Sequence, residues 1–214
     1  MKMSNPLRRT KLAWLVLAAI VLAIGAAWYL PGAGSASAQN RAGTATAVFA
    51  GGCFWCTEAD FEKVPGVLSA VSGYTGGRTA NPTYEQVSAG GTGHYEAVRV
   101  TFNPAKVSYA QLVRYYFRTV DPLDGGGQFC DRGESYRTAI FTANPAERRI
   151  ADAERTRVNG QLGRKVATPL LNAAAFYPAE GYHQDYYKKN PVRYKYYRYR
   201  CGRDARLKEV WGKG

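Results

Sequence analysis

Histidine is scarce in this chain of 214 residues, which contains only His94 and His183. A zinc site would need two more ligands beside the pair Cys53-x-x-Cys56, and neither the two histidines nor the other cysteines offer a second paired spacing, so we expect no metal and no cofactor. No internal repeat is visible either, which excludes an array of repeated structural units.

Acidic residues are also few, with 16 Asp and Glu against 29 Lys and Arg and a net charge of +13. Much of the basic excess lies in residues 188–208. Such a cluster can attract nucleic acid or anionic lipid, or it can simply keep a surface solvated. No helix-turn-helix, zinc-finger or single-strand-binding pattern accompanies it, so we expect a solvated face and no nucleic-acid partner. A basic surface-binding module remains the alternative from a different class.

The N-terminus has the order of a secretory signal peptide: basic residues, an apolar run, then Ala36-Ser37-Ala38 before a polar residue. The apolar run, residues 12–30, is long enough to span a bilayer, so an uncleaved membrane anchor is the alternative. In both cases the basic flank predicts that the rest of the chain lies outside the cytoplasm. We therefore expect residues 1–38 to direct export, residues 39–44 to be a linker, and the protein to be periplasmic or secreted.

The remaining residues are numerous enough for one domain with a real core, and 46% of the chain is hydrophobic. Residue patterns predict strands at 45–50, 67–74, 94–102, 136–142 and 170–175. They predict helices at 53–64, 108–120, 144–162 and 179–189, a short helix at 84–87, and a long glycine-rich loop at 121–135. This irregular alternation indicates an α+β fold with a mixed sheet and flanking helices.

The cysteines are Cys53, Cys56, Cys130 and Cys201, and structural disulfides are the default expectation in an exported protein. Cys53 differs because it follows two glycines at a predicted strand-to-helix junction, where backbone amides and the helix dipole favour a thiolate. Phe54 and Trp55 come next and can form an apolar wall beside the sulfur. The Cys53-x-x-Cys56 spacing is also that of a redox pair, which makes a general thiol–disulfide oxidoreductase the rival function.

Several blocks of sequence resemble, in order, the A-type peptide-methionine sulfoxide reductases. These blocks are Gly51–Trp55, Val71–Gly77, Pro82–Val87, Thr92–Val98, Asp131–Gly133 with Ser135–Arg137, and Ala179–Tyr186. They span residues 45–190 and leave residues 191–214 as a basic C-terminal tail. The resemblance implies a ferredoxin-like two-layer sandwich, and we expect a monomer.

The resemblance also implies roles for individual residues. Cys53 matches the nucleophile that attacks the sulfoxide sulfur, and Glu96 matches the acid that protonates the departing oxygen. Burial can hold that carboxyl neutral near pH 7, as the role requires. The apolar wall for the S-methyl group corresponds to Phe54 and Trp55. The hydrogen-bonding partners around the oxygen and the acid correspond to Tyr84, Asp131 and Tyr136.

The implied reaction reduces the S-epimer of methionine sulfoxide, in oxidised proteins or as the free amino acid, and leaves Cys53 as a sulfenic acid. A second thiol then forms a disulfide that a thioredoxin-like protein reduces. We favour Cys201 as this resolving thiol, since a tail can swing toward the site. Cys56 comes next and Cys130 last. The family often has glycine and asparagine where this chain has Cys56 and Cys130, so the assignment stays open.

Overall fold

The structure is a computed structural model that describes residues 43–212. The predicted export segment and most of the predicted linker lie outside the described residues. Within residues 43–212, no helix combines the length and the apolar character needed to cross a membrane.

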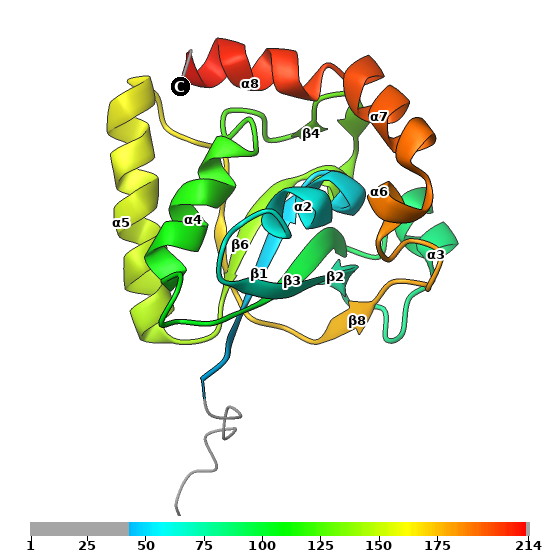
Figure 1. The fold of residues 1–214 in the computed structure, drawn as a ribbon, viewed down its shortest axis with the longest axis horizontal. Coiled ribbons are helices and arrows are strands. Elements are labelled where there is room, and N and C mark those ends of the chain that lie inside the picture. Colours follow the sequence, from blue (N-terminus) through cyan, green and yellow to red (C-terminus); the bar gives the residue numbers. More distant parts are fainter. Residues whose placement is uncertain (1–42, 213–214) are drawn as a thin grey trace, which may run out of the picture. The chain divides into compact units, whose positions relative to one another are not determined.

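A six-stranded sheet forms the centre of the described part, in the order β7-β6-β1-β3-β2-β8 (Figure 1). All five predicted strands are present: β1 (Ala45–Gly51), β2 (Val67–Thr75), β3 (Tyr95–Phe102), β6 (Thr138–Thr142) and β7 (Leu170–Asn172). The sixth strand of the sheet, β8 (Phe176–Pro178), was not predicted. Their pairs are antiparallel except for β6 with β7, so the sheet is mixed as predicted.

The central strands and two helices have the ferredoxin-like β-α-β-β-α-β order. Helix α2 (Phe54–Phe61) connects β1 to β2, and helix α4 (Tyr109–Arg118) lies between β3 and β6. Both helices pack on the sheet, and α5 (Pro145–Leu162) packs on α4. The main core fills the space between these helices and the sheet, with Phe49, Phe61 and Tyr116 stacked on one another. The α+β prediction is therefore confirmed.

Local capping explains where several helices begin. Helix α4 starts with a capping box in which the Ser108 hydroxyl and the Gln111 side chain each accept a backbone N–H of the other residue. Helix α5 begins at the predicted cap, where the Asn144 side chain accepts from the Glu147 amide and a proline occupies the first turn. The helix α3 (Tyr84–Ala89) has a capping box of its own.

The predicted helix 179–189 is wrong for most of its length. Only α6 (Tyr186–Lys189) is helical there, and the preceding residues form turns. The side chain of Gln184 accepts from the Ser72 amide and donates to the carbonyls of Ser72 and Ala179, while Asp185 has a φ of +55°. These bonds to β2 replace the i-to-i+4 bonds that a helix would make.

The residues beyond 190 fold as two further helices, α7 (Pro191–Arg200) and α8 (Arg203–Trp211), rather than as an extended tail. They pack on the domain through Tyr194 and Arg203, which are both buried. The predicted loop 121–135 holds a small hairpin, β4 (Gly127–Gln128) and β5 (Asp131–Arg132), followed by a 3₁₀ turn (Glu134–Tyr136). The hairpin lies beneath α7 and α8 in Figure 1.

Candidate active site

Cys53 is the N-cap residue of α2, at the junction that the sequence predicted. The chain that leads from β1 to Cys53 requires glycine at position 52, because Gly52 has a φ of +79° and a Cβ there would lie 2.5 Å from Cβ of Gln128. The Cys53 carbonyl accepts the Cys56 and Thr57 amides, so the cysteine is held at the start of the helix. Only 6% of Cys53 is exposed.

Glu96 lies on β3 with its carboxylate against the same helix end. Its Oε2 accepts the Phe54 backbone N–H at 2.9 Å, and the residue is 3% exposed. Burial raises the pKa of Glu96 to about 8, and the Phe54 hydrogen bond offsets only part of that shift. The carboxyl group is therefore mostly protonated at pH 7 and can donate a proton to a leaving oxygen. Glu96 is therefore not an ordinary solvent-facing residue of the strand.

Cys53 and Cys56 are both free thiols, both buried, and hydrogen-bonded to each other. Burial, the neighbouring Cys56 sulfur and the nearby Glu96 and Asp131 raise the pKa of Cys53. The hydrogen bond from Cys53 and the charges of two arginines lower the pKa of Cys56 to about 7. Cys56 therefore ionises more readily than Cys53, whereas the sequence led us to expect the thiolate at Cys53.

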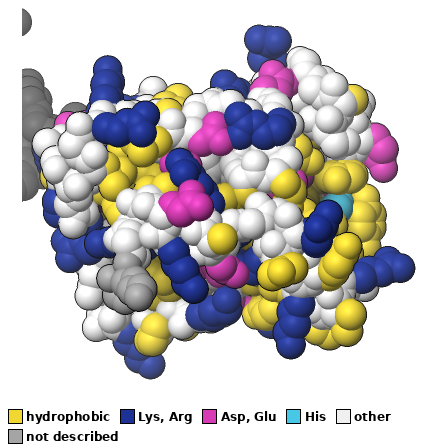
Figure 2. Space-filling model, turned by 90° about the horizontal axis from the view of Figure 1, so that it is seen from above, with side chains coloured by type: hydrophobic (Ala, Val, Ile, Leu, Met, Phe, Trp, Pro, Cys, Tyr) yellow, Lys and Arg dark blue, Asp and Glu magenta, His cyan; other side chains and the backbone are white. Residues whose placement is uncertain are grey.

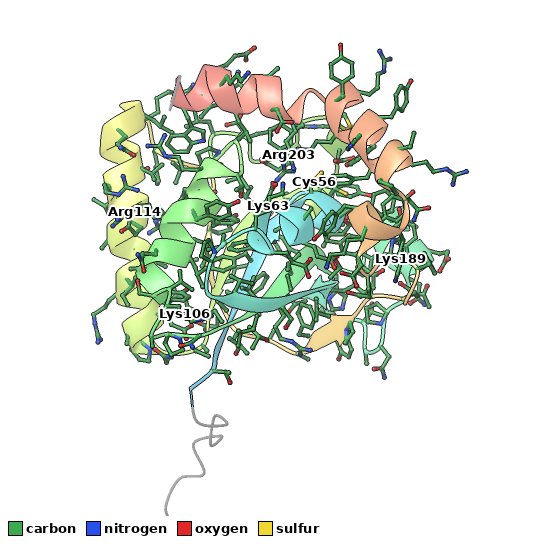
Figure 3. All side chains as sticks on the ribbon, viewed as in Figure 1. Cys56, Lys63, Lys106, Arg114, Lys189 and Arg203 are labelled. Carbon is green, nitrogen blue, oxygen red and sulfur yellow. A yellow bond between two sulfur atoms is a disulfide. The ribbon has the colours of Figure 1, made fainter. Side chains whose placement is uncertain are left out.

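The two arginines come from the C-terminal helices and form a buried charge cluster with Asp60 of α2. Arg198 Nη1 is 3.0 Å from both carboxylate oxygens of Asp60, and Arg203 Nε is 3.8 Å from Oδ2. Arg203 also donates to the carbonyls of Gly51 and Thr119 and lies over the Phe129 ring. In Figure 3 the Arg203 side chain points from α8 toward α2, where Cys56 lies.

Aromatic rings surround the next residues of α2. Phe54 is buried and Trp55 is half-buried, with its indole stacked on Tyr186 at 3.7 Å between ring centroids. Trp55 Nε1 donates to Nδ1 of His183 at 3.0 Å, and the His183 ring also lies 4.5 Å from the Tyr84 ring. Because Nδ1 accepts this bond and burial lowers the pKa of His183, the imidazole is neutral.

The side chains of Tyr84 and Tyr136 contact each other near the carboxyl group of Glu96. Their hydroxyl groups are hydrogen-bonded, and burial together with the charge of Glu96 raises the pKa of each. Glu180 fixes this arrangement by accepting the Tyr84 amide at 2.9 Å and the Tyr74 hydroxyl at 2.8 Å. Two neutral phenols beside a neutral carboxyl offer donors to a polar S=O group.

Asp131 lies at the edge of the same site, on β5. It accepts the hydroxyl of Tyr197, a residue of α7 that is also hydrogen-bonded to Cys53. The neighbouring Cys130 forms a disulfide with Cys201, with 4.8 Å between the two Cα atoms. Helix α7 is therefore a wall of the site, and the disulfide fastens its C-terminal end to the β4–β5 hairpin.

The structure thus brings together Cys53, Cys56, Glu96, Asp131 and the aromatic residues that the sequence analysis named. Cys201, favoured there as the resolving thiol, is paired with Cys130, and which thiol resolves Cys53 stays a prediction. Four residues with contacts at the site were missed as site residues: Glu180, His183, Tyr197 and Arg203. The first two stand in a motif block that carried the resemblance, whereas nothing in the basic pattern around Tyr197 and Arg203 marked them.

Comparisons with known proteins agree with this geometry. The family model for peptide methionine sulfoxide reductase matches residues 45–214. The peptide methionine sulfoxide reductase MsrA 2 of Rhizobium meliloti (strain 1021) is 56% identical over 166 residues, which are 78% of this chain and 83% of that protein.

Two solved structures are similar in fold. Mxr1 from Saccharomyces cerevisiae in reduced form has a TM-score of 0.68 at 29% identity, covering 72% of this chain and 89% of that chain. Mxr1 in complex with Trx2 has a TM-score of 0.50 at 21% identity, covering 69% of this chain and 87% of that chain. On the family match and the Rhizobium relative, this chain belongs to the peptide methionine sulfoxide reductase A family.

Proposed function

We propose that this methionine sulfoxide reductase acts outside the cytoplasm on the S-epimer, with Cys53 as nucleophile, Glu96 as general acid and Cys56 as resolving thiol. The observation that carries the proposal is the buried carboxyl of Glu96, whose pKa is raised to about 8 and which is bonded to the helix end that begins at Cys53. A neutral acid and a thiol at one helix end are what sulfoxide reduction requires.

The first step transfers the oxygen. The Cys53 proton passes to Cys56, and the Cys53 sulfur attacks the sulfoxide sulfur while Glu96 protonates its oxygen. Tyr84 and Tyr136 donate hydrogen bonds to that oxygen, and Phe54 and Trp55 contact the S-methyl group. The hydroxyl group then transfers from the substrate sulfur to the Cys53 sulfur as the newly formed S–S bond breaks. Methionine leaves, and Cys53 becomes a sulfenic acid, oxidised by the two electrons that reduce the sulfoxide.

The second step forms a disulfide between Cys53 and Cys56. Cys56 lies one helical turn away, within the Cα separation that a disulfide permits. Its sulfur attacks the sulfenic sulfur, and the hydroxyl group leaves as water with one proton taken up. Arg203 and Arg198 support this role because their charges favour the attacking thiolate. The Cys130–Cys201 disulfide leaves Cys56 as the free thiol nearest to Cys53 among the described cysteines.

The cycle closes when a thioredoxin-type dithiol protein reduces the Cys53–Cys56 disulfide. Yeast Mxr1 has been crystallised in complex with Trx2, which supports a reductant of this class. Export is supported by the predicted signal segment or anchor alone, at residues 1–38, and the N-terminal residue of the mature protein would test it.

The pH dependence of a single turnover tests the acid. The Glu96 proton is present below its pKa of about 8 and is lost as the pH rises through that value. We expect the rate of methionine release, measured by rapid quench without reductant, to fall about tenfold per pH unit above pH 8 once the acid is ionised. A rate that stays flat up to pH 10 would exclude Glu96 as the proton donor.

A general thiol–disulfide oxidoreductase is the second candidate, because Cys53 and Cys56 are a free buried pair. The two functions separate in the Cys56→Ser variant. Sulfoxide reduction still completes a first turnover there, more slowly because the acceptor of the Cys53 proton is gone, whereas disulfide reduction, which needs both sulfurs, is lost. A wild-type protein that reduces disulfides at the rate at which it reduces sulfoxides would favour the second candidate.

A further inference from the structure

Helix α7 has an unusual surface, since three of its exposed positions carry large apolar side chains. Val192 is 80% exposed, Tyr196 67% and Tyr199 81%. Their spacing of four and three residues places them in one stripe along the outer face of the helix. The inner face holds Tyr194, Tyr197 and Arg198, which pack on the domain, so the stripe contributes nothing to the core.

Basic side chains border this stripe on both sides. By helical geometry Lys195 lies along one edge, and Arg193 and Arg200 lie along the other. All three are exposed, and none makes an ion pair with another residue among 43–212. Other bases of the same region are neutralised, for example Lys188 by Glu62 and Asp185, and Arg198 by Asp60 and Asp204. In Figure 2, which looks down on α7 and α8, hydrophobic and basic side chains alternate at the α7 end.

A groove of about 430 Å³ runs between α7 and α8 and adjoins the stripe. Lys195 and Tyr199 line its α7 side, and Lys208 lines its α8 side beside Asp204, whose carboxylate is paired with Arg198. Ring faces and lysine stems offer contact to many apolar side chains, while the ammonium groups select for negative charge. The surface therefore fits a polypeptide that carries carboxylate side chains.

The stripe lies across one helix from the candidate active site. Tyr197, on the inner face of α7, hydrogen-bonds to both Asp131 and Cys53. An α-helix with side chains is about 10–12 Å across, and an extended chain advances about 3.3 Å per residue. The path around half of such a helix is about 16–19 Å, so a residue about five to six positions from a sulfoxide held at Cys53 can reach the outer face of α7.

We propose that the outer face of α7, with the groove between α7 and α8, binds the polypeptide that flanks the methionine sulfoxide and selects acidic segments. This inference rests on the proposed function, because it takes Cys53 as the reacting atom. The surface contributes to recognition of protein substrates and leaves the free amino acid unaffected.

Steady-state kinetics with four substrates test the proposal. Three peptides of equal length carry one methionine sulfoxide flanked at positions about five and six away by Asp, Asn or Lys, and the fourth substrate is free methionine sulfoxide. We expect kcat/KM to be highest for the Asp peptide and lowest for the Lys peptide, with a difference of about tenfold at low salt that shrinks as salt is added.

Two double variants then test whether the preference for acidic peptides comes from the outer face of α7. Lys195→Gln/Arg200→Gln should remove most of the preference for the Asp peptide, and Tyr196→Ser/Tyr199→Ser should lower kcat/KM for all three peptides by about threefold to tenfold. Both should reduce free methionine sulfoxide at the wild-type rate. The matched control is Arg149→Gln on α5, an exposed arginine remote from α7 in Figure 1, which should change nothing.

Several results would overturn the inference. Equal kcat/KM for the Asp and Lys peptides would exclude charge selection. A rise in KM for the dithiol reductant alone would assign the surface to that protein, and binding to anionic lipid vesicles with unchanged peptide kinetics would assign it to a membrane. Failure of the wild-type protein to reduce free methionine sulfoxide would reject the proposed function instead, independently of α7.

Discussion

The two cysteine pairs of this protein lie in opposite environments. Cys53 and Cys56 are free thiols, 6% and 2% exposed, in the first turn of a helix inside the domain. Cys130 and Cys201 are joined in a disulfide across 71 residues of sequence, and Cys130 is exposed. Carboxyl groups and arginines act on the first pair, whereas the second pair ties a hairpin to the corner between α7 and α8.

This difference shows that surroundings, more than the thiol itself, determine what a cysteine does. The inner pair has a neutral acid, two phenols and a helix end within reach, which are the groups that sulfoxide reduction uses. The outer pair has Asp131 as a neighbour but no such set of groups. We therefore expect the inner pair to carry the first turnover and the outer pair to carry stability.

The largest expected effect is on Cys53. Cys53→Ser should lower single-turnover methionine release by more than about a thousandfold, because a serine hydroxyl is a far weaker nucleophile than a thiolate. The double variant Cys130→Ser/Cys201→Ser should retain the first turnover within about twofold, since neither sulfur contacts the reacting atoms. Rapid-quench kinetics on both proteins would measure this, and a slow first turnover in the double variant would contradict the division between the pairs.

Glu96→Gln should slow the sulfoxide step by about 10²–10⁴-fold, the usual range for a positioned general acid. The amide keeps the shape of the side chain but has no acidic proton to give to the leaving oxygen. The matched control is Glu85→Gln, an exposed residue in the first turn of α3. A single-turnover rate at pH 7 equal to that of wild type would reduce Glu96 to a structural residue.

Arg203→Met should destabilise the domain by about 3 kcal/mol or more, since it leaves Asp60 and two backbone carbonyls short of a buried partner. Urea unfolding measures this loss. A second readout is specific to the inner pair: the pH at which Cys56 reacts with iodoacetamide should rise, because a charge that lowers its pKa has gone. Unchanged alkylation in a folded variant would show that Arg203 acts on stability alone.

Removing the outer disulfide should have the smallest effect. Cys130→Ser/Cys201→Ser should lower the free energy of unfolding by about 2–4 kcal/mol, the usual contribution of a crosslink that closes a long loop. Thermal unfolding of the variant beside the wild type, with and without a reducing agent, would measure it. Equal stability under all conditions would mean that α7 and α8 are held by packing and by the Arg203 cluster.

Much of the fold could be predicted from local patterns. The caps at Ser108 and Asn144 and the apolar spacing of the two helices that follow them need only neighbouring residues, so those helices were correctly predicted. The helix expected at 179–189 was wrong because Gln184 bonds to β2, a strand more than a hundred residues earlier. Local patterns contain no information about such a partner.

The candidate site likewise has features that the sequence predicted and features that depend on distant contacts. Its position at Cys53 followed from two glycines before a helix, and the roles of Glu96, Tyr84, Asp131 and Tyr136 followed from the family resemblance. The burial that keeps Glu96 protonated, and the placement of Tyr197 and Arg203 beside the inner cysteines, did not follow from either. The pKa values of the site depend on these distant contacts.

The sequence by itself determined the family, most of the helices and strands, and the choice of Cys53 as the proposed nucleophile, because each depends on residues that are neighbours in the chain. Only the tertiary structure decided which cysteines pair and which cysteine of the inner pair has the lower pKa. It also decided that the basic C-terminal segment is part of the site. These properties depend on desolvation and on charges brought together from residues 60 to 203, and both arise only when the chain folds.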